Sequence, residues 1–292
     1  MPQQATMARR ARRFLRRNPV GRWLAGKPQS PFADPANAPR VIVHTAHHKV
    51  GTSWFSAIFR ALSEHFAIPL VRDPDELPAK GTAFLLQHRV LVEPAKLDSY
   101  KGSHMIRDPR DVAISGYHYH LWTREGWANR KIKDLPEQMR QKWRRLPLDE
   151  IGHMSYQEYL NSLPEEAGLL TEIDRCSNTV NRDIFDWNYD DPNVFEFRYE
   201  DAMVDETPIF RAMFEHYGFH AQAVNEALDV AARFSFANRT GRSVGEVEGE
   251  QHIRSGKLQQ WREEYTAEHR QLFKELHADE LIKLGYETDT DW

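Results

Sequence analysis

The chain has 292 residues, a formal net charge of −4 and a hydrophobic content of 40%. A chain of this size can bury a sizeable core in one large domain or two small ones. No run approaches the roughly 18 apolar residues of a membrane span, and the single cysteine, Cys176, excludes an intramolecular disulfide and fits a reducing compartment. We therefore expect a cytoplasmic protein, and we expect no nucleic-acid partner for a chain of negative net charge.

The first 24 residues carry seven arginines and no acid, so the remaining chain carries −11. Because aromatic and leucine side chains lie between the arginines, this arm is suited to a peripheral contact with an anionic membrane, while a solvated or helix-packed extension is the alternative. It does not resemble an export signal, since no apolar core of about 7–15 residues follows the arginines. Four prolines mark residues 26–39 as a linker. We expect residues 1–39 to form this basic arm and linker, and residues 40–292 to form a single domain.

Residues 41–54, VIVHTAHHKVGTSW, predict a buried strand, a turn with one lysine and one glycine, and a helix. The helix is indicated by Phe55, Phe59, Leu62 and Phe66, which recur at steps of 4, 3 and 4. Such a turn directs backbone N–H groups and the positive end of a helix dipole at one point, which is typical of an anion site. An ordinary strand-to-helix connection with a surface lysine is the alternative, because G-x-x-x-x-G-K-[ST] is not matched.

Residues 67–81 are polar and rich in proline, and residues 82–88 predict a strand that ends at His88. Residues 105–119, MIRDPRDVAISGYHY, predict a second strand end, a proline-marked turn and a helix start. Arg107 and Ser115 are positioned to hold another phosphate, through a fork of donors and a hydroxyl. Alternatively, Arg107 and Arg110 pair with neighbouring aspartates on a solvated surface.

The second half alternates helices and strands. Residues 121–155 predict an irregular surface insertion with three tryptophans that serve as packing residues, and residues 170–187 carry a helical stripe at steps of 3 and 4. A strand at 194–197 and helices at 208–217, 221–232 and 268–284 follow, with a polar loop of four glycines at 237–257 that we expect to order around a bound phosphate. Strands that alternate with helices predict an α/β fold with a central parallel sheet flanked by helices.

The two turn segments together resemble the sulfotransferases that use 3′-phosphoadenosine 5′-phosphosulfate (PAPS), of the bacterial type. The family's K-S-G-T-[ST]-W corresponds here to KVGTSW at residues 49–54, with Val50 as the departure, and its R-[ND]-P-[RK]-D-V-x-x-S is fully matched at residues 107–115. Residues 197–201, FRYED, and Arg254-Ser255-Gly256 followed by Trp261 are similar to two later motifs. The resemblance spans residues 40–285 in the same order and implies a P-loop-like nucleotide-binding fold.

This resemblance implies a role for each matched residue. Lys49 would act on the leaving oxygen, and the 5′-phosphosulfate would be held by Lys49, Val50, Gly51, Thr52, Ser53 and Trp54. The 3′-phosphate would be held by Arg107, Ser115, Arg254, Ser255 and Gly256, and adenine would be contacted by Trp54, Tyr199 and Phe236. The catalytic base would be His88, with His47, His48 and His104 as rivals.

PAPS would be the co-substrate, with no metal, because the sulfuryl group carries a single net negative charge. The acceptor, a small molecule, glycan or lipid, would offer a hydroxyl or an amine, and a hydroxyl fits a histidine base better. Two alternatives remain open. A phosphate-loop kinase would need a Mg²⁺-binding acid near the lysine, and a non-catalytic nucleotide-binding relative would lack the base or the lysine.

Overall fold

The computed structural model describes residues 30–143, 145–241 and 256–292. The basic arm, Arg254, Ser255 and most of the 237–257 loop lie outside these residues, so the predictions made for them stay predictions.

A five-stranded parallel sheet forms the centre of the molecule, which confirms the predicted α/β class. Its strands, in spatial order, are β2 (Leu70–Val71), β3 (Ala83–Gln87), β1 (Val41–Thr45), β4 (Tyr100–Ile106) and β5 (Val194–Arg198). The sequence reading missed β2, because a two-residue edge strand in a proline-rich segment has no periodic pattern.

Strand β1 is buried along its whole length, and its alternate residues pack on opposite faces of the sheet. Ile42 belongs to the main core with the aromatic stripe of helix α3 (Thr52–Phe66), whereas Val41 and Val43 pack with Leu85 in a second, smaller core. The second core is covered by partly buried side chains of shorter segments rather than by α3. The four predicted core positions of α3 are all buried.

The remaining helices have the following bounds. Those of the middle of the chain are α4 (Pro109–His120), α5 (Gly126–Asn129), α6 (Glu137–Arg140), α7 (Leu148–Ile151), α8 (Tyr156–Ser162), α9 (Glu165–Ser177) and α10 (Val180–Phe185). Those of the later part are α11 (Tyr199–Val204), α12 (Glu206–His216), α13 (Ala221–Ala231), α14 (Phe236–Thr240), α15 (Trp261–Glu264) and α16 (Ala267–Lys283). Short 3₁₀ helices are η1 (Pro35–Asn37), η2 (Pro74–Glu76), η3 (Pro94–Lys96), η4 (Ile132–Asp134) and η5 (Ala232–Phe234).

The helical stripe at 170–187 is divided between two helices, α9 and α10. The chain leaves helical geometry at Thr179, whose backbone angles are φ −128° and ψ −101°. The inner apolar positions on both sides, Ile173, Val180 and Ile184, are nevertheless buried, while Leu170 and Trp187 at the ends of the stripe are partly buried. The periodicity therefore identified the buried face correctly but did not reveal the break, because the spacing of the stripe continues across it.

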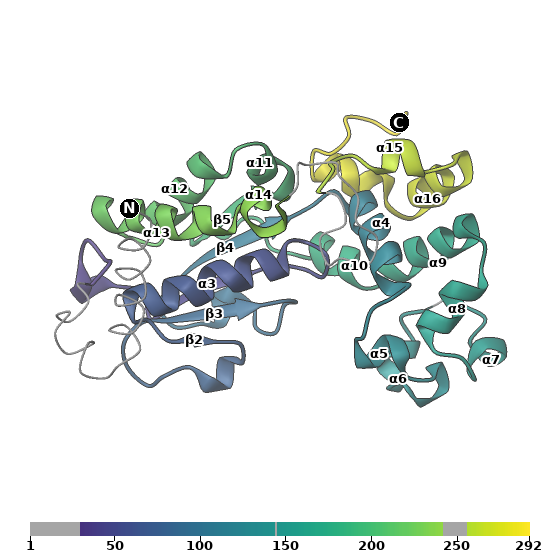
Figure 1. Ribbon diagram of the computed structural model, residues 1–292, viewed down its shortest axis with the longest axis horizontal. Coiled ribbons are helices and arrows are strands. Elements are labelled where there is room, and N and C mark those ends of the chain that lie inside the picture. Colours follow the sequence, from purple (N-terminus) through teal and green to yellow (C-terminus); the bar gives the residue numbers. More distant parts are fainter. Residues whose placement is uncertain (1–29, 144, 242–255) are drawn as a thin grey trace, which may run out of the picture.

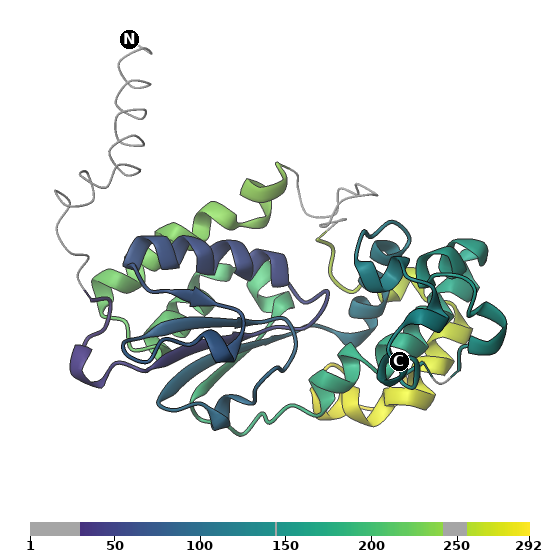
Figure 2. The same ribbon diagram turned by 90° about the horizontal axis from the view of Figure 1, so that it is seen from below.

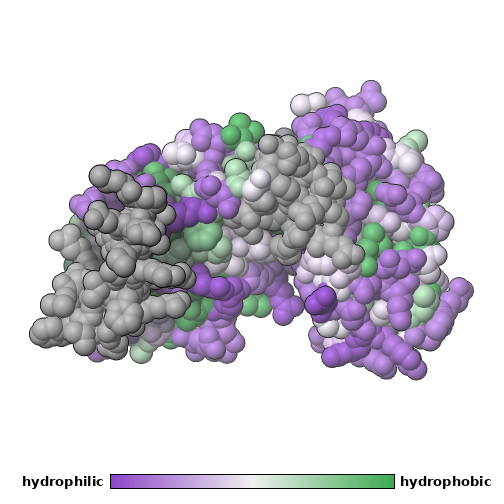
Figure 3. Space-filling view, viewed as in Figure 1, coloured by the Kyte–Doolittle hydropathy of each residue, from purple (hydrophilic) through white to green (hydrophobic). Residues whose placement is uncertain are grey.

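Helices α3, α12 and α13 lie along the sheet, while α4 to α10, α15 and α16 gather beyond the carboxyl ends of the strands (Figures 1 and 2). The view in Figure 3 is mostly hydrophilic, with small scattered apolar areas. Part of the expected linker packs onto the sheet layer, since Phe32 is buried against Phe219 with ring centroids 5.5 Å apart. No helix of the described residues is long and apolar enough to cross a membrane.

The connections on the two sides of β1 run in opposite directions, because β3 and β2 lie on one side of it and β4 and β5 on the other. In open α/β sheets, ligands bind in the crevice at the carboxyl ends of the strands where the order reverses. The turns that follow β1 and β4 are therefore the place to look for a site.

Candidate active site

The turn after β1 carries two residues with left-handed backbone, Lys49 at φ 65° and Gly51 at φ 64°. Glycine is required at position 51 for a second reason, since a Cβ there would come within 2.6 Å of the terminal methyl of Met105. Helix α3 begins directly afterwards with no side-chain cap on its first turn. The arrangement matches the expected strand, turn and helix, with the positive end of the α3 dipole at the end of β1.

Val50 differs from the expectation. The resemblance places Val50 among the residues that hold the 5′-phosphosulfate, but its backbone N–H donates to the carbonyl oxygen of His47 at 3.0 Å, and the valine side chain is fully buried. The valine thus packs the turn against the core. An anion bound at this turn would therefore contact its other residues.

The turn after β4 is built by its own sequence. Asp108 caps α4 by accepting from the backbone N–H of Arg110, and Pro109 occupies the first turn of the helix, where it needs no donor. The same aspartate also binds the Arg110 guanidinium through both carboxylate oxygens. This local pairing directs Arg110 away from the crevice and leaves Arg107 at its floor.

Arg107 and Lys49 lie side by side, because Nη1 of Arg107 donates to the carbonyl oxygen of Lys49 at 3.3 Å. Arg107 is 6% exposed, its Nε is buried without a partner in the described chain, and its nearest carboxylate is that of Asp111 at 3.7 Å. The Lys49 ammonium lies 3.9 Å from the ring centroid of Tyr119. Burial and the neighbouring Arg107 charge lower the pKa of Lys49 to about 7. The crevice therefore holds two basic groups that an anion would stabilise.

Arg110 has a structural role. It is 1% exposed, pairs with Asp108 and with Glu287, and lies 3.7 Å from the ring centroid of Trp261. Trp292 packs on the same guanidinium at 4.5 Å. The alternative of pairing with neighbouring aspartates thus holds for Arg110 in a buried form, which ties α4 to the C-terminal segment. Arg107 also has an aspartate neighbour, Asp111 at 3.7 Å, but its Nε stays without a partner among the described residues.

Three aromatic residues were expected to contact adenine. Tyr199 lies against Arg107, with the guanidinium carbon 4.8 Å from the ring centroid. Trp54 is 4% exposed and packs mainly in the core. Phe236 lies against Gly256, where a Cβ would come within 2.4 Å of its ring, so these two expected residues are brought together. Ser115 lies half-buried on α4.

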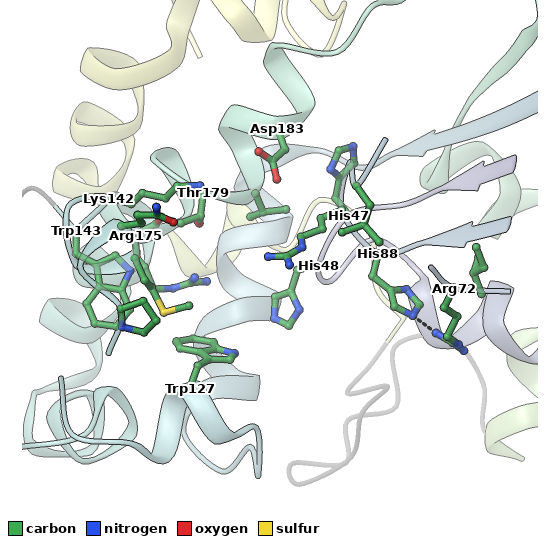
Figure 4. Close-up of a pocket in the computed structure, with 17 residues that line it drawn as sticks. His47, His48, Arg72, His88, Trp127, Lys142, Trp143, Arg175, Thr179 and Asp183 are labelled. Atoms are coloured by element: carbon green, nitrogen blue, oxygen red, sulfur yellow. Dashed lines mark hydrogen bonds between the residues drawn. The ribbon is translucent and has the colours of Figure 1, made fainter. Parts of the chain in front are cut away.

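A cavity of about 750 Å³ opens between the sheet and the helical region (Figure 4). One wall carries His47, His48, His88 and Arg72, and the opposite wall carries side chains of the inserted helical segments: Trp127, Lys142, Trp143, Arg175, Thr179 and Asp183. The 121–155 insertion thus lines the cavity with two of its tryptophans, and Trp143 also packs in the core at 2% exposure.

His88 follows β3 directly, as predicted, and it is exposed in the cavity. Its Nε2 accepts from the guanidinium of Arg72 (Figure 4). Partial burial and the Arg72 charge lower its pKa, which keeps the imidazole neutral at pH 7. Because Nε2 accepts from Arg72, Nδ1 carries the ring proton.

The other cavity histidines are each hydrogen-bonded to a second histidine and through it to a glutamate. Nε2 of His47 lies 2.8 Å from Nε2 of His104, whose Nδ1 lies 2.7 Å from Glu196. Nε2 of His48 lies 3.2 Å from Nε2 of His120. Sequence reasoning singled out His47, His48 and His104 but missed His120 and both glutamates, because their partners are far away in the chain.

The second histidine pair ends at Glu172, which is fully buried and lies 3.1 Å from Nδ1 of His120. Among the described residues, no group of three or more histidine, cysteine or acidic side chains is arranged to hold a metal ion.

Comparison with known proteins identifies the family to which the chain belongs. The sulfotransferase domain family matches residues 85–285, which is more than half of the chain, so the chain belongs to this family, as the sequence motifs predicted. No curated protein sequence matches. The matched range begins after the turn at residues 49–54. The assignment of this turn therefore rests on its own motif and geometry.

Solved structures similar to the chain include retinol dehydratase in complex with androsterone and inactive cofactor PAP, at 15% identity and a TM-score of 0.48, with 84% of this chain and 81% of that chain covered. Retinol dehydratase with retinol and PAP gives 15% identity, coverage of 84% and 82%, and a TM-score of 0.47. A mouse sulfotransferase complexed with PAP gives 15% identity, coverage of 87% and 90%, and a TM-score of 0.44.

Proposed function

We propose that this sulfotransferase moves a sulfuryl group from PAPS to an acceptor hydroxyl or amine in the cavity beside His48 and His88. The observation that carries the proposal is the adjacency of Lys49 and Arg107 at the switch point of the sheet. Nη1 of Arg107 lies 3.3 Å from the backbone carbonyl oxygen of Lys49, so two basic side chains share one end of the sheet, where a bound anion would stabilise both. The unpartnered Nε of Arg107 supplies a donor for it.

The residues around this pair fit a nucleotide with two separate phosphate groups. The turn at residues 49–54 would hold the 5′ end, with Lys49 placed to stabilise negative charge on the leaving oxygen. Arg107, Ser115 and Gly256 would hold the 3′-phosphate, together with Arg254 and Ser255. The aromatic side chains of Tyr199 and Phe236, and an edge of Trp54, would contact adenine. When bound, PAPS supplies the sulfuryl group and the leaving phosphate.

The acceptor side is the cavity, which joins the nucleotide side through the consecutive residues His47, His48 and Lys49. His88 is neutral and lies at the end of β3. Its Nε2, which holds the lone pair and accepts from Arg72 in the free protein, is the proposed base for the acceptor's proton, and the acceptor hydroxyl would take the place of the Arg72 donor. Because both a base and Lys49 are present, catalysis is favoured over a non-catalytic nucleotide-binding role.

Calorimetry tests the nucleotide assignment. Adenosine 3′,5′-bisphosphate (PAP) should bind far more tightly than AMP or ATP, because Arg107 contributes charge-assisted hydrogen bonds to a 3′-phosphate only. Equal affinity for AMP and the bisphosphate would refute the assignment. Release of the bisphosphate from PAPS in the presence of a mixed panel of phenols, alcohols, sugars and amines then separates an enzyme from a binding protein.

A further inference from the structure

The proposed reaction gives no role to two of the three histidines that line the cavity, His47 and His48. His48 is half-buried, lines the cavity, and stacks on His120 with ring centroids 5.3 Å apart and an interplanar angle of 9°. Behind it, His120 and Glu172 are fully buried. The three side chains form a continuous hydrogen-bonded row from Glu172 in the core to His48 at the cavity wall.

Glu172 acts only as an acceptor in this row. Its carboxylate receives Nε of Arg175 at 3.0 Å, the hydroxyl of Tyr156 at 2.6 Å and the thiol of Cys176 at 3.1 Å. Burial opposes its ionisation, but the charge of Arg175 and the hydrogen bond from His120 hold the pKa of Glu172 well below its usual value. Because an ionised carboxylate has no proton to give, Nδ1 of His120 must be the donor in their contact.

The donor role of Nδ1 of His120 determines the tautomers of both imidazoles. Burial lowers the pKa of His120, so the ring is neutral and its Nε2 carries a lone pair. Nε2 of His48 must therefore donate to it. Burial and the proximity of His120, Lys49 and Arg175 lower the pKa of His48 as well, so its Nδ1 also carries a lone pair, and no group of the described chain bonds that atom.

The lone pair on Nδ1 of His48 determines which chemical groups can bind there. The oxygens of a sulfuryl or phosphate group are acceptors and would be repelled, so the partner of His48 must be a polar hydrogen. Because the proposed base, His88, takes the proton of the reacting group, His48 is left for a different donor on the same molecule.

We propose that Nδ1 of His48 binds a second hydroxyl or amine hydrogen of the acceptor, so that the acceptor class is a diol, polyol or amino alcohol rather than a molecule with one polar hydrogen. His120 and Glu172 are positioning residues that fix the tautomer of His48. This inference rests on the proposed sulfuryl transfer and adds a specificity-determining residue to it.

The tautomer is measured without any turnover. Long-range ¹H–¹⁵N NMR spectra of the histidine-labelled protein at pH 7 should show His48 protonated at Nε2 and not at Nδ1. In His120→Phe, which keeps a ring in the stack but removes the acceptor, His48 should become a mixture of tautomers. An imidazolium, or a proton on Nδ1 in the wild-type chain, would overturn the proposal.

The specificity is tested with matched acceptors that differ by one polar hydrogen: catechol against 2-methoxyphenol, and 1,2-cyclohexanediol against 2-methoxycyclohexanol. We expect the diol of each pair to have a kcat/KM about 10- to 100-fold higher, mainly through KM. In His48→Phe that preference should vanish, because the phenyl ring offers no lone pair to the second hydroxyl. His118→Phe is the matched control for a histidine outside the row, since His118 lies on the same helix as His120 but pairs with Glu264 at 2.9 Å.

Two results would contradict the inference. One is an unchanged diol preference in His48→Phe. The other is a loss of about 10²–10⁴ in kcat with both members of a pair, which would make His48 the base itself. A failure of the wild-type chain to bind adenosine 3′,5′-bisphosphate would instead refute the proposed function, and the NMR result would still report on the histidine row.

Discussion

The low pKa of Lys49 leads to a measurable prediction about nucleotide binding. In the free protein, burial and Arg107 lower this pKa to about 7, against the attraction of Glu125 and Glu172. A bound phosphate would favour the ammonium and raise the pKa towards its ordinary value of about 10.5. Binding above pH 7 should therefore take up a proton at Lys49.

The magnitude follows from linkage. At pH 8 a group with a pKa of about 7 is protonated in about a tenth of the molecules, so binding should take up about 0.9 proton. Because the bound form has the higher pKa, full affinity is present below about pH 7. It should be about half of that at pH 7 and fall about tenfold per pH unit well above it, which is about 50-fold between pH 7 and pH 9.

The assay is titration calorimetry at pH 8 with adenosine 3′,5′-bisphosphate in buffers of different ionisation enthalpy, because the slope of the binding enthalpy against that enthalpy gives the proton count. At this pH the phosphates of the ligand are already ionised. Lys49→Met should show no uptake, and Lys49→Arg should show none while keeping affinity at pH 9. A zero slope for the wild-type chain, or an unchanged slope in Lys49→Met, would refute the reasoning.

Four further outcomes are expected. Arg107→Ala should weaken binding of adenosine 3′,5′-bisphosphate by a few kcal/mol and leave AMP nearly unaffected, as measured by calorimetry; an equal loss for both would place the 3′-phosphate elsewhere. His88→Ala should lower kcat by about 10²–10⁴ at unchanged nucleotide affinity, and near-full turnover at saturating acceptor would exclude it as the base. Arg110→Ala should destabilise the fold by about 3–5 kcal/mol in denaturant titrations, because it leaves two carboxylates unpaired; a change under 1 kcal/mol would show that they find other partners. Deletion of residues 1–24 should weaken binding to anionic vesicles at low salt without affecting turnover of a soluble acceptor, and equal vesicle binding would make the arm a mere extension.

The sequence by itself determined the features that depend on neighbouring residues. The strand and turn at residues 41–54, the proline-marked helix start at 109, and the stripe of Phe55, Phe59, Leu62 and Phe66 are local patterns, and the fold has them where they were predicted. Parallel strands followed by helices bring their carboxyl ends to one edge, so the adjacency of the Lys49 and Arg107 turns also followed from the pattern.

The tertiary structure alone decided which side chains face one another across the chain. Two arginines in one motif, Arg107 and Arg110, differ in role because Glu287 and Trp292 come from the far end of the sequence to cover only the second. His48 contacts His120, 72 residues later in the chain, because the end of α4 packs beside the turn that follows β1. Periodicity specifies the face of an element that is buried, but the partner on that face is set by how the elements pack, and the tautomer of a histidine depends on that partner.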